Sequence, residues 1–150
     1  MRLRDFLFPR KSCTTAFKTP PGLPKVSVQY ELGVDGQGRE TIKETRKGAE
    51  PHTYDWVVGK DGIRSEAMTY PAEARKLDLL TRRQRIIEIA DQAPAPRGAL
   101  GPCLTVLSRQ DKDRIIRTYE TWCRGVGLAR TDESRGRARV IYEIEATTCR

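Results

Sequence analysis

The sequence has little of the chemistry on which most enzymes and metalloproteins depend. His52 is the only histidine, and no two of the four cysteines have a C-x-x-C or similar ligand spacing. No serine or cysteine lies in a recognisable nucleophile motif, and the glycines between residues 33 and 38 are too loosely spaced for a phosphate loop. We therefore expect no catalytic residue, no metal site and no cofactor, and we interpret the protein as a non-enzyme.

Long apolar runs are also missing. No stretch approaches the roughly 18 apolar residues of a membrane-spanning helix, and Phe6-Leu7-Phe8 is too short for the core of a secretory signal. The four cysteines, Cys13, Cys103, Cys123 and Cys149, are expected to be reduced and free of metal. These features predict a cytoplasmic protein that does not contact a membrane.

Positive charge is in excess and is unevenly distributed. The 150 residues include 28 lysines and arginines against 20 acidic residues, a formal net charge of +8. The middle of the chain, residues 25–71, is almost neutral, whereas residues 1–24 and 72–150 are basic. Such an excess favours polyanionic partners, nucleic acid above all, but it is also compatible with an ordinary solvated surface.

The first half of the chain divides into an arm and a β-rich region. Residues 1–24 carry prolines at 20, 21 and 24 and predict an extended basic arm. Residues 25–71 alternate apolar and polar side chains, which predicts two β-hairpins. The expected strands cover residues 26–32, 41–45, 54–58 and 63–69. Tyr54 and Trp56 could stack on bases, but their alternation with Val58 favours packing in a core.

The pattern changes after Ala72, and residues 72–150 are expected to be mainly helical. Apolar residues recur on one face of a helix over residues 72–92, where Thr81 and Gln84 have capping-box spacing. A second helix is expected from Ser108 to Arg124, and a strand over residues 140–144. The predicted fold class is therefore α+β, with two β-hairpins followed by a helical half that ends in a β-ribbon.

The outward face of the second helix is the leading candidate for a binding site. Four polar residues recur there at helical spacing, namely Arg114, Arg117, Thr121 and Arg124. Guanidinium groups on a helix can contact phosphates or guanine edges in the major groove of DNA. The alternative is a solvated face, which Asp113 and Glu120 at its margin support.

A second group of arginines follows this helix and adds to the candidate site. Its members are Arg130, Arg135, Arg137 and Arg139. The last three alternate along the chain, which would place them on one face of a strand with Val140, Tyr142 and Ile144 on the other face. Such a basic hairpin would contact phosphates without reading sequence.

Two segments resemble winged helix-turn-helix DNA-binding domains. Residues 80–90, LTRRQRIIEIA, are similar to the first helix of that family, and residues 126–144 resemble its wing. The resemblance covers about residues 79–145 and implies duplex DNA as the partner, with contacts from the outward side of the 109–124 helix. It departs from the family in one respect: the short second helix would have to be Pro102–Leu107, a segment that is apolar and brief. A regulatory or phage or plasmid accessory role is the function that follows.

A second resemblance gives the alternative function. Val28-Gln29-Tyr30, Asp35, Gly38, Glu40, Ile42 and Thr45 are similar to an N-terminal segment of internal scaffolding proteins of small single-stranded-DNA phages. This resemblance implies a viral structural or assembly protein whose partners are coat protein or further copies of the chain. Exposed apolar surface would favour this alternative, and a continuous arginine surface would favour DNA binding.

Overall fold

The strands of the protein form one antiparallel sheet, seen in a computed structural model that describes residues 1–48, 50–91, 100–109 and 116–150. One short helix precedes them. The elements are α1 (Arg4–Leu7), β1 (Cys13–Lys18), β2 (Val26–Val34), β3 (Glu40–Lys47), β4 (His52–Val58), β5 (Gly62–Arg64), β6 (Thr69–Pro71), β7 (Leu79–Thr81), β8 (Gln84–Ala90), β9 (Cys103–Arg109), β10 (Ile116–Cys123), β11 (Gly127–Arg135) and β12 (Ala138–Thr147).

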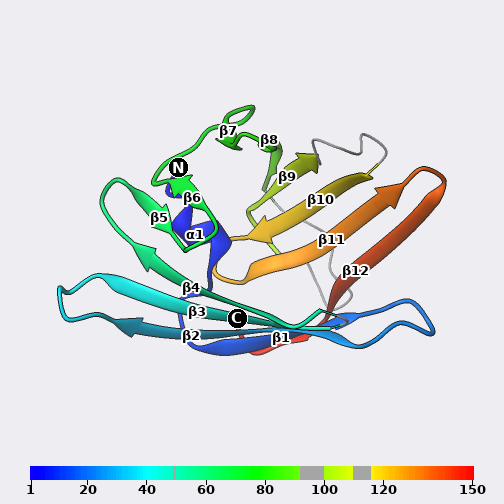
Figure 1. The fold of residues 1–150 in the computed structure, drawn as a ribbon, viewed down its shortest axis with the longest axis horizontal. Coiled ribbons are helices and arrows are strands. Elements are labelled where there is room, and N and C mark those ends of the chain that lie inside the picture. Colours follow the sequence, from blue (N-terminus) through cyan, green and yellow to red (C-terminus); the bar gives the residue numbers. More distant parts are fainter. Residues whose placement is uncertain (49, 92–99, 110–115) are drawn as a thin grey trace.

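The order of the strands nearly closes the sheet into a barrel. Neighbours follow the order β6-β5-β4-β3-β2-β1-β12-β11-β10-β9-β8-β7, so the first and last strands of the chain, β1 and β12, are paired in the middle. The two edge strands, β6 and β7, come close to each other without pairing. In Figure 1 the strands β1–β4 form the lower layer, β9–β11 lie above them, and β12 descends between the two.

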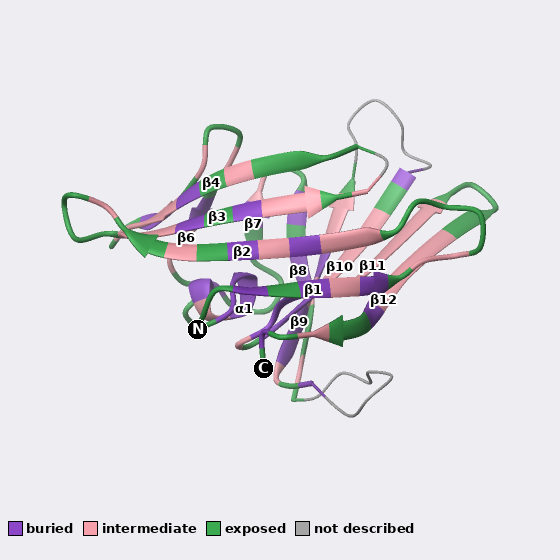
Figure 2. Cartoon of the chain, turned by 90° about the horizontal axis from the view of Figure 1, so that it is seen from below, coloured by how far each residue is buried: buried purple, intermediate pink, exposed green. Residues whose placement is uncertain are grey.

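The N-terminal segment fills one end of the space between the layers. Leu3, Phe6 and Phe8 are buried in the core, and α1 packs against β10 and β11. Figure 2 shows this helix among the strands, coloured as buried. Arg4 fixes the segment, because its guanidinium binds Glu40 of β3 through two hydrogen bonds of 2.6 and 2.9 Å and also donates to the carbonyl of Phe8. Residues 1–24 thus contribute a helix and a strand to the barrel.

Three of the four strands predicted in the first half are confirmed. They coincide with β2, β3 and β4, and the predicted strand at residues 140–144 lies within β12. The single strand expected over residues 63–69 is instead a hairpin of β5 and β6, which pair with each other across a turn. The alternation in the confirmed strands has the expected physical cause: Val28 and Tyr30 of β2 and Ile42 of β3 point into the core, whereas the residues between them face outward or sideways.

The α+β fold class and the winged helix-turn-helix resemblance are wrong. Residues 79–90, expected to be helical, form the hairpin of β7 and β8, and the described part of residues 108–124 lies mostly in β9 and β10. Thr81 and Gln84 do not cap a helix. They flank the turn of the hairpin, and the Thr81 hydroxyl donates to the Gln84 side-chain oxygen at 3.1 Å. A hydroxyl and an amide three residues apart suit a tight turn as well as a helix N-terminus.

The expectation of reduced cysteines is also wrong. Cys13 is bonded to Cys149, which joins β1 to the C-terminal end of the chain beyond β12, and Cys103 is bonded to Cys123, which joins β9 to β10. The spacing along the chain gave no sign of this, because cross-strand neighbours in a large sheet need not be near in sequence. Disulfides persist mainly in oxidising compartments, so reduced cysteines no longer support a cytoplasmic location.

None of the helices in the described part of the chain has the length and apolar character needed to cross a bilayer.

Candidate functional site

The helix expected from Ser108 to Arg124 is replaced by β9 and β10 in the described residues, so its outward face does not form. Arg117 and Thr121 lie on β10, Arg124 follows the end of that strand, and Arg114 lies outside the described residues. On a strand, Arg117 and Thr121 share a face, but here it is the outer face of the barrel, where Thr121 contacts the hydroxyl of Thr105 at 3.5 Å.

The arginines of the predicted wing do lie on one hairpin, but not on one face. Arg139 is paired across β11 and β12 with Ser134, and Arg135 is paired with Ala138, so the two side chains project from opposite faces. Each also has an acidic partner: Arg139 donates to Asp132 at 2.9 Å, and Arg135 donates to Glu133 at 3.1 Å. The ion pair with Arg139 lowers the pKa of the Asp132 carboxyl.

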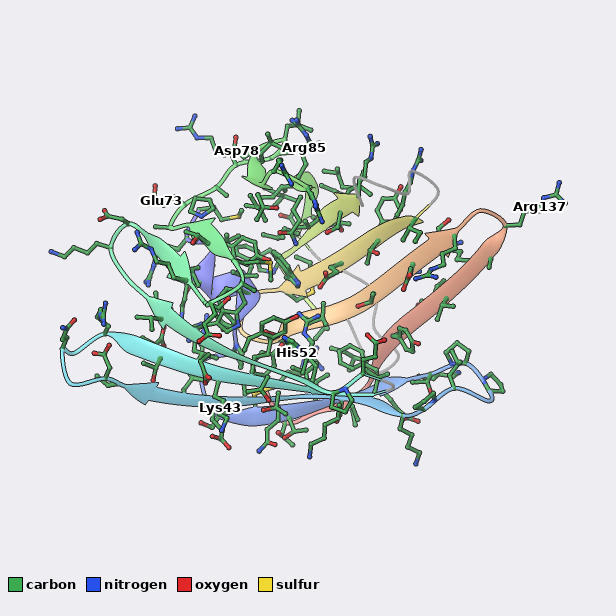
Figure 3. All side chains as sticks on the ribbon, viewed as in Figure 1. Lys43, His52, Glu73, Asp78, Arg85 and Arg137 are labelled. Atoms are coloured by element: carbon green, nitrogen blue, oxygen red, sulfur yellow. A yellow bond between two sulfur atoms is a disulfide. The ribbon has the colours of Figure 1, made fainter. Side chains whose placement is uncertain are left out.

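Arg130 and Arg137 complete this group. Arg130 of β11 lies 3.7 Å from Glu143 and 3.9 Å from Asp132. Arg137 lies in the turn between the strands, and Figure 3 shows its side chain pointing away from the molecule at the tip of the hairpin. Much of the positive charge on this hairpin is therefore neutralised locally.

The interior of the barrel holds a more concentrated group of polar side chains. Glu44 and Arg46 of β3 point inward because they share a face with the buried Ile42. Glu120 reaches the same space from β10 on the other side, where it shares a face with the buried Trp122. Arg46 lies 3.3 Å from Glu44 and 3.8 Å from Glu120, so one guanidinium lies between two carboxylates.

Hydrogen bonds and charges hold these groups in place. The indole N–H of Trp56 donates to Glu44 at 3.1 Å, and only 4% of Glu44 is exposed. Burial opposes the charge of Arg46, but the carboxylates of Glu44 and Glu120 hold the pKa of its guanidinium above the ordinary value. Burial, with Glu120 nearby, likewise raises the pKa of the Tyr70 phenol.

Aromatic rings form the walls around this polar group. Trp56 and Tyr70 are stacked with ring centroids 5.5 Å apart, and Tyr54 and Trp122 lie on either side of them. The guanidinium of Arg46 lies 5.6 Å from the centroid of the Tyr54 ring. Rings held in this way present flat faces to any molecule that enters the space.

The enclosed space has an inner and an outer part. The inner part is a cavity of about 100 Å³ beside Glu44, Arg46 and Trp56. The outer part is an open cleft of about 650 Å³ between the β7–β8 turn and the ends of β9 and β10. Both are lined by Met68, Gln84 and Glu120, so they adjoin. The outer volume lies within the range of about 300–1,000 Å³ that is typical of small-molecule sites.

Two polar atoms in this space lack a hydrogen-bond partner among the described residues. They are the hydroxyl oxygen of Ser108, on β9, and the Oε2 atom of Glu120, and both are buried. Ser108 and Glu120 line the outer cleft together. Leaving a buried polar atom unsatisfied costs about 1–3 kcal/mol, so such atoms in a cleft mark a place for a polar ligand group. We call Ser108, Glu120, Glu44, Arg46 and the aromatic walls the interior site.

The interior site does not have the composition of a metal site. No group of three or more histidine, cysteine or acidic side chains gathers in the described part of the chain. His52, at the start of β4, is exposed and packs its ring 4.4 Å from that of Tyr54.

Comparisons of the chain with protein-family models, with curated proteins and with solved structures found no match.

Sequence patterns did not reveal the interior site because Ser108 and Glu120 lie in a segment expected to be helical, which separates them from the strand of Glu44. Glu44 and Arg46 have the same parity along the chain as Ile42, which a strict two-residue pattern places inward. Charged residues at inward positions of a strand are the signal that could have pointed to this site.

Proposed function

We propose that the protein binds a small organic ligand in the interior site and acts as a binding protein, without catalysis. The observation that carries this proposal is the pair of buried, unsatisfied oxygen atoms of Ser108 and Glu120 in the outer cleft, which adjoins the inner cavity with its aromatic walls. The Glu120 oxygen only accepts hydrogen bonds, whereas the Ser108 hydroxyl can donate or accept, so the ligand should present a donor to Glu120.

The charges of the interior site favour a cationic donor. In the inner cavity, Glu44 and Glu120 carry two negative charges against the single positive charge of Arg46, and Arg46 lies beyond hydrogen-bond range of Glu120. Arg82, Arg83 and Arg109 line the outer cleft, so a cation is favoured only at its inner end, beside Glu120. A planar ligand in the outer cleft with an amino or amidino group could bind Glu120, and a ring that reaches the inner cavity would meet the side chains of Trp56 and Tyr70. The ligand class is therefore a small aromatic amine or a compound of similar shape and charge.

The disulfides favour an oxidising compartment for this function. Nucleic-acid binding and a role in viral assembly with coat protein, both expected from the sequence, stay predictions. The proposed DNA contacts lose the helix that was to present them, and the paired arginines on the β11–β12 hairpin offer less charge to phosphates than their number indicates.

The proposal is tested by comparing three ligands that share one ring. Benzylamine, benzyl alcohol and benzoate have similar size and differ in charge, so their affinities isolate the contribution of the cation. We expect benzylamine to bind best, as measured by isothermal titration calorimetry. Glu120→Gln should weaken it by about tenfold or more, as expected when a charge-assisted hydrogen bond is lost.

The matched control is Glu133→Gln, which removes the same charge from β11 at a position that does not line the cleft. It should leave the affinity for benzylamine within a factor of about two. Equal binding of all three ligands, or equal losses in the two variants, would mean that Glu120 does not recognise a ligand.

A further inference from the structure

A second cleft lies at the end of the barrel where β10 finishes. It has a volume of about 650 Å³ and shares no lining residue with the interior site. Four of its lining residues are cations, namely Arg10, Lys11, Arg124 and Arg150. We call it the end cleft.

The charge of the end cleft is of one sign. No acidic residue is among the described residues that line it. Within the part of the chain that the structure describes, Arg10, Lys11 and Arg124 are exposed and have no carboxylate within 4.0 Å. This differs from the β11–β12 hairpin, where Arg135 and Arg139 have acidic partners.

Backbone pairing brings the cations together from separate parts of the chain. Pro9 forms a parallel bridge with Gly125, which brings the segment of Arg10 and Lys11 next to the segment of Arg124. The Nε atom of Arg10 lies 3.8 Å from the position that a Cβ atom on Gly125 would occupy. The N–H of Arg124 donates to the carbonyl of Pro102 at 2.9 Å, which fixes the opposite wall.

Both disulfides support the same arrangement. Cys123 immediately precedes Arg124, and its partner Cys103 follows Pro102. Cys149 lines the end cleft, and its partner Cys13 lies two residues after Lys11. The segments that carry the cations are therefore held by covalent bonds, so like charges can remain close together without a compensating acid.

We propose that the end cleft binds a small, multiply charged anion of the phosphate type. Guanidinium groups bind phosphate oxygens through paired hydrogen bonds, and a lysine beside them adds a compact positive charge. An anion also relieves the repulsion between Arg10, Lys11 and Arg124, which have no carboxylate within 4.0 Å among the described residues. The volume suits a pyrophosphate or a small phosphate ester, and the site is independent of the proposed amine site in the interior.

Pyrophosphate is the probe for the test, with binding measured by isothermal titration calorimetry at low salt. The double variant Arg10→Gln/Arg124→Gln removes two cations from the end cleft. We expect it to weaken binding by about a hundredfold or more, because each charge-assisted hydrogen bond contributes about 1.5–3 kcal/mol. These side chains are exposed, so the variant should fold, which its circular dichroism spectrum checks.

The matched control is Arg117→Gln/Arg137→Gln, which removes the same net charge from exposed positions outside the cleft. It should retain the wild-type affinity within a factor of about three. Equal losses in the two double variants would overturn the proposal, since only net charge would then matter. Binding of a duplex oligonucleotide that depends on Arg10 and Arg124, with no binding of pyrophosphate, would overturn it in favour of a polymeric partner.

Discussion

Arg46 of β3 and Glu120 of β10 face each other across the interior of the barrel, with 3.8 Å between Nη2 and Oε2. This distance is too long for a hydrogen bond, and Arg46 lies closer to Glu44, at 3.3 Å. Arg46 therefore neutralises part of the charge of Glu120 without satisfying its outer oxygen. A ligand that donates a hydrogen bond to Glu120 would satisfy this oxygen.

This relationship predicts that Arg46 competes with a cationic ligand. Replacing Arg46 by Gln leaves two carboxylates in the interior site without their counterion. We expect the affinity for benzylamine to rise by roughly tenfold, because the attraction between charges a few ångströms apart is strong in a partly buried site. Calorimetric titration of the variant measures the change. A fall in affinity, as expected for Glu120→Gln, would show that Arg46 contacts the ligand itself.

The disulfides predict a protein without free thiols and a difference in stability between two variants. Alkylation of the unfolded, unreduced protein should leave its mass unchanged. The Cys13–Cys149 bond closes a loop with a sequence separation of 136, and Cys103–Cys123 one of 20. Loop entropy predicts losses of about 5 and about 3 kcal/mol in the free energy of unfolding when each pair is replaced by serine.

Urea denaturation of the two serine variants measures these losses. Incorporation of four alkyl groups by the wild-type protein, or a larger loss on removal of Cys103–Cys123, would contradict the account.

Much of the first half of the fold could be predicted from the sequence, and most of the second half could not. In β2 and β3, single buried residues alternate with exposed ones, which is the two-residue period of a strand. In β7 and β8, Leu79-Leu80 and Ile86-Ile87 are pairs seven residues apart, a spacing that also fits two turns of a helix. Only long-range pairing decides between these periods, and it brings β8 beside β9.

Gly127 should be the glycine least tolerant of substitution among those described here. Its φ is +87°, and an added Cβ atom would lie 2.7 Å from the Tyr30 hydroxyl and 3.0 Å from the carbonyl of Leu7. Gly127→Ala combines backbone strain with a clash and should cost about 2–4 kcal/mol of stability. Gly136→Ala is the control, because its φ is +57° with open space around it.

Thermal or urea denaturation compares the two glycine variants. We expect the control to lose only about 1–2 kcal/mol, the cost of the left-handed backbone alone. Equal losses would mean that the close approach of Tyr30 and Leu7 to Gly127 adds nothing.

Two of the five tyrosines should ionise at a higher pH than ordinary phenols do. Burial, with Glu44 nearby, raises the pKa of Tyr30, and burial, with Glu120 nearby, raises that of Tyr70. Since the unfolded chain loses these protons first, the stability they contribute is complete below about pH 10 and is lost as the pH rises further. In a pH titration, phenolate absorbance should show a step at high pH. Circular dichroism, recorded in parallel, should show that the protein unfolds over the same pH range.

The variant Tyr70→Phe tests whether Tyr70 contributes to that high-pH step. Its amplitude should fall by one tyrosine while the earlier ionisation is unchanged. A single midpoint for all five tyrosines in the folded protein would contradict the burial of Tyr30 and Tyr70.

The candidate sites show a similar division between what the sequence could and could not predict. The charge excess favoured a polyanionic partner without locating its contacts, and the cations without an acidic partner that share a cleft are Arg10, Lys11 and Arg124, not the arginines of the predicted wing. Some of the acids that neutralise the wing lie on the neighbouring strand, as Asp132 of β11 does for Arg139 of β12. Their proximity depends on strand register, which local spacing does not define.

The most direct test of the interior site uses the protein's own tryptophans. The chain has two, Trp56 and Trp122, and both line the inner cavity. A ligand that enters must therefore change their fluorescence. Titration with benzylamine should give a saturable change in emission, and Glu120→Gln should require at least about tenfold more ligand for half-saturation. Emission that does not respond to benzylamine, or the same half-saturation in both proteins, would contradict the proposal that this barrel binds a cationic ligand at Glu120.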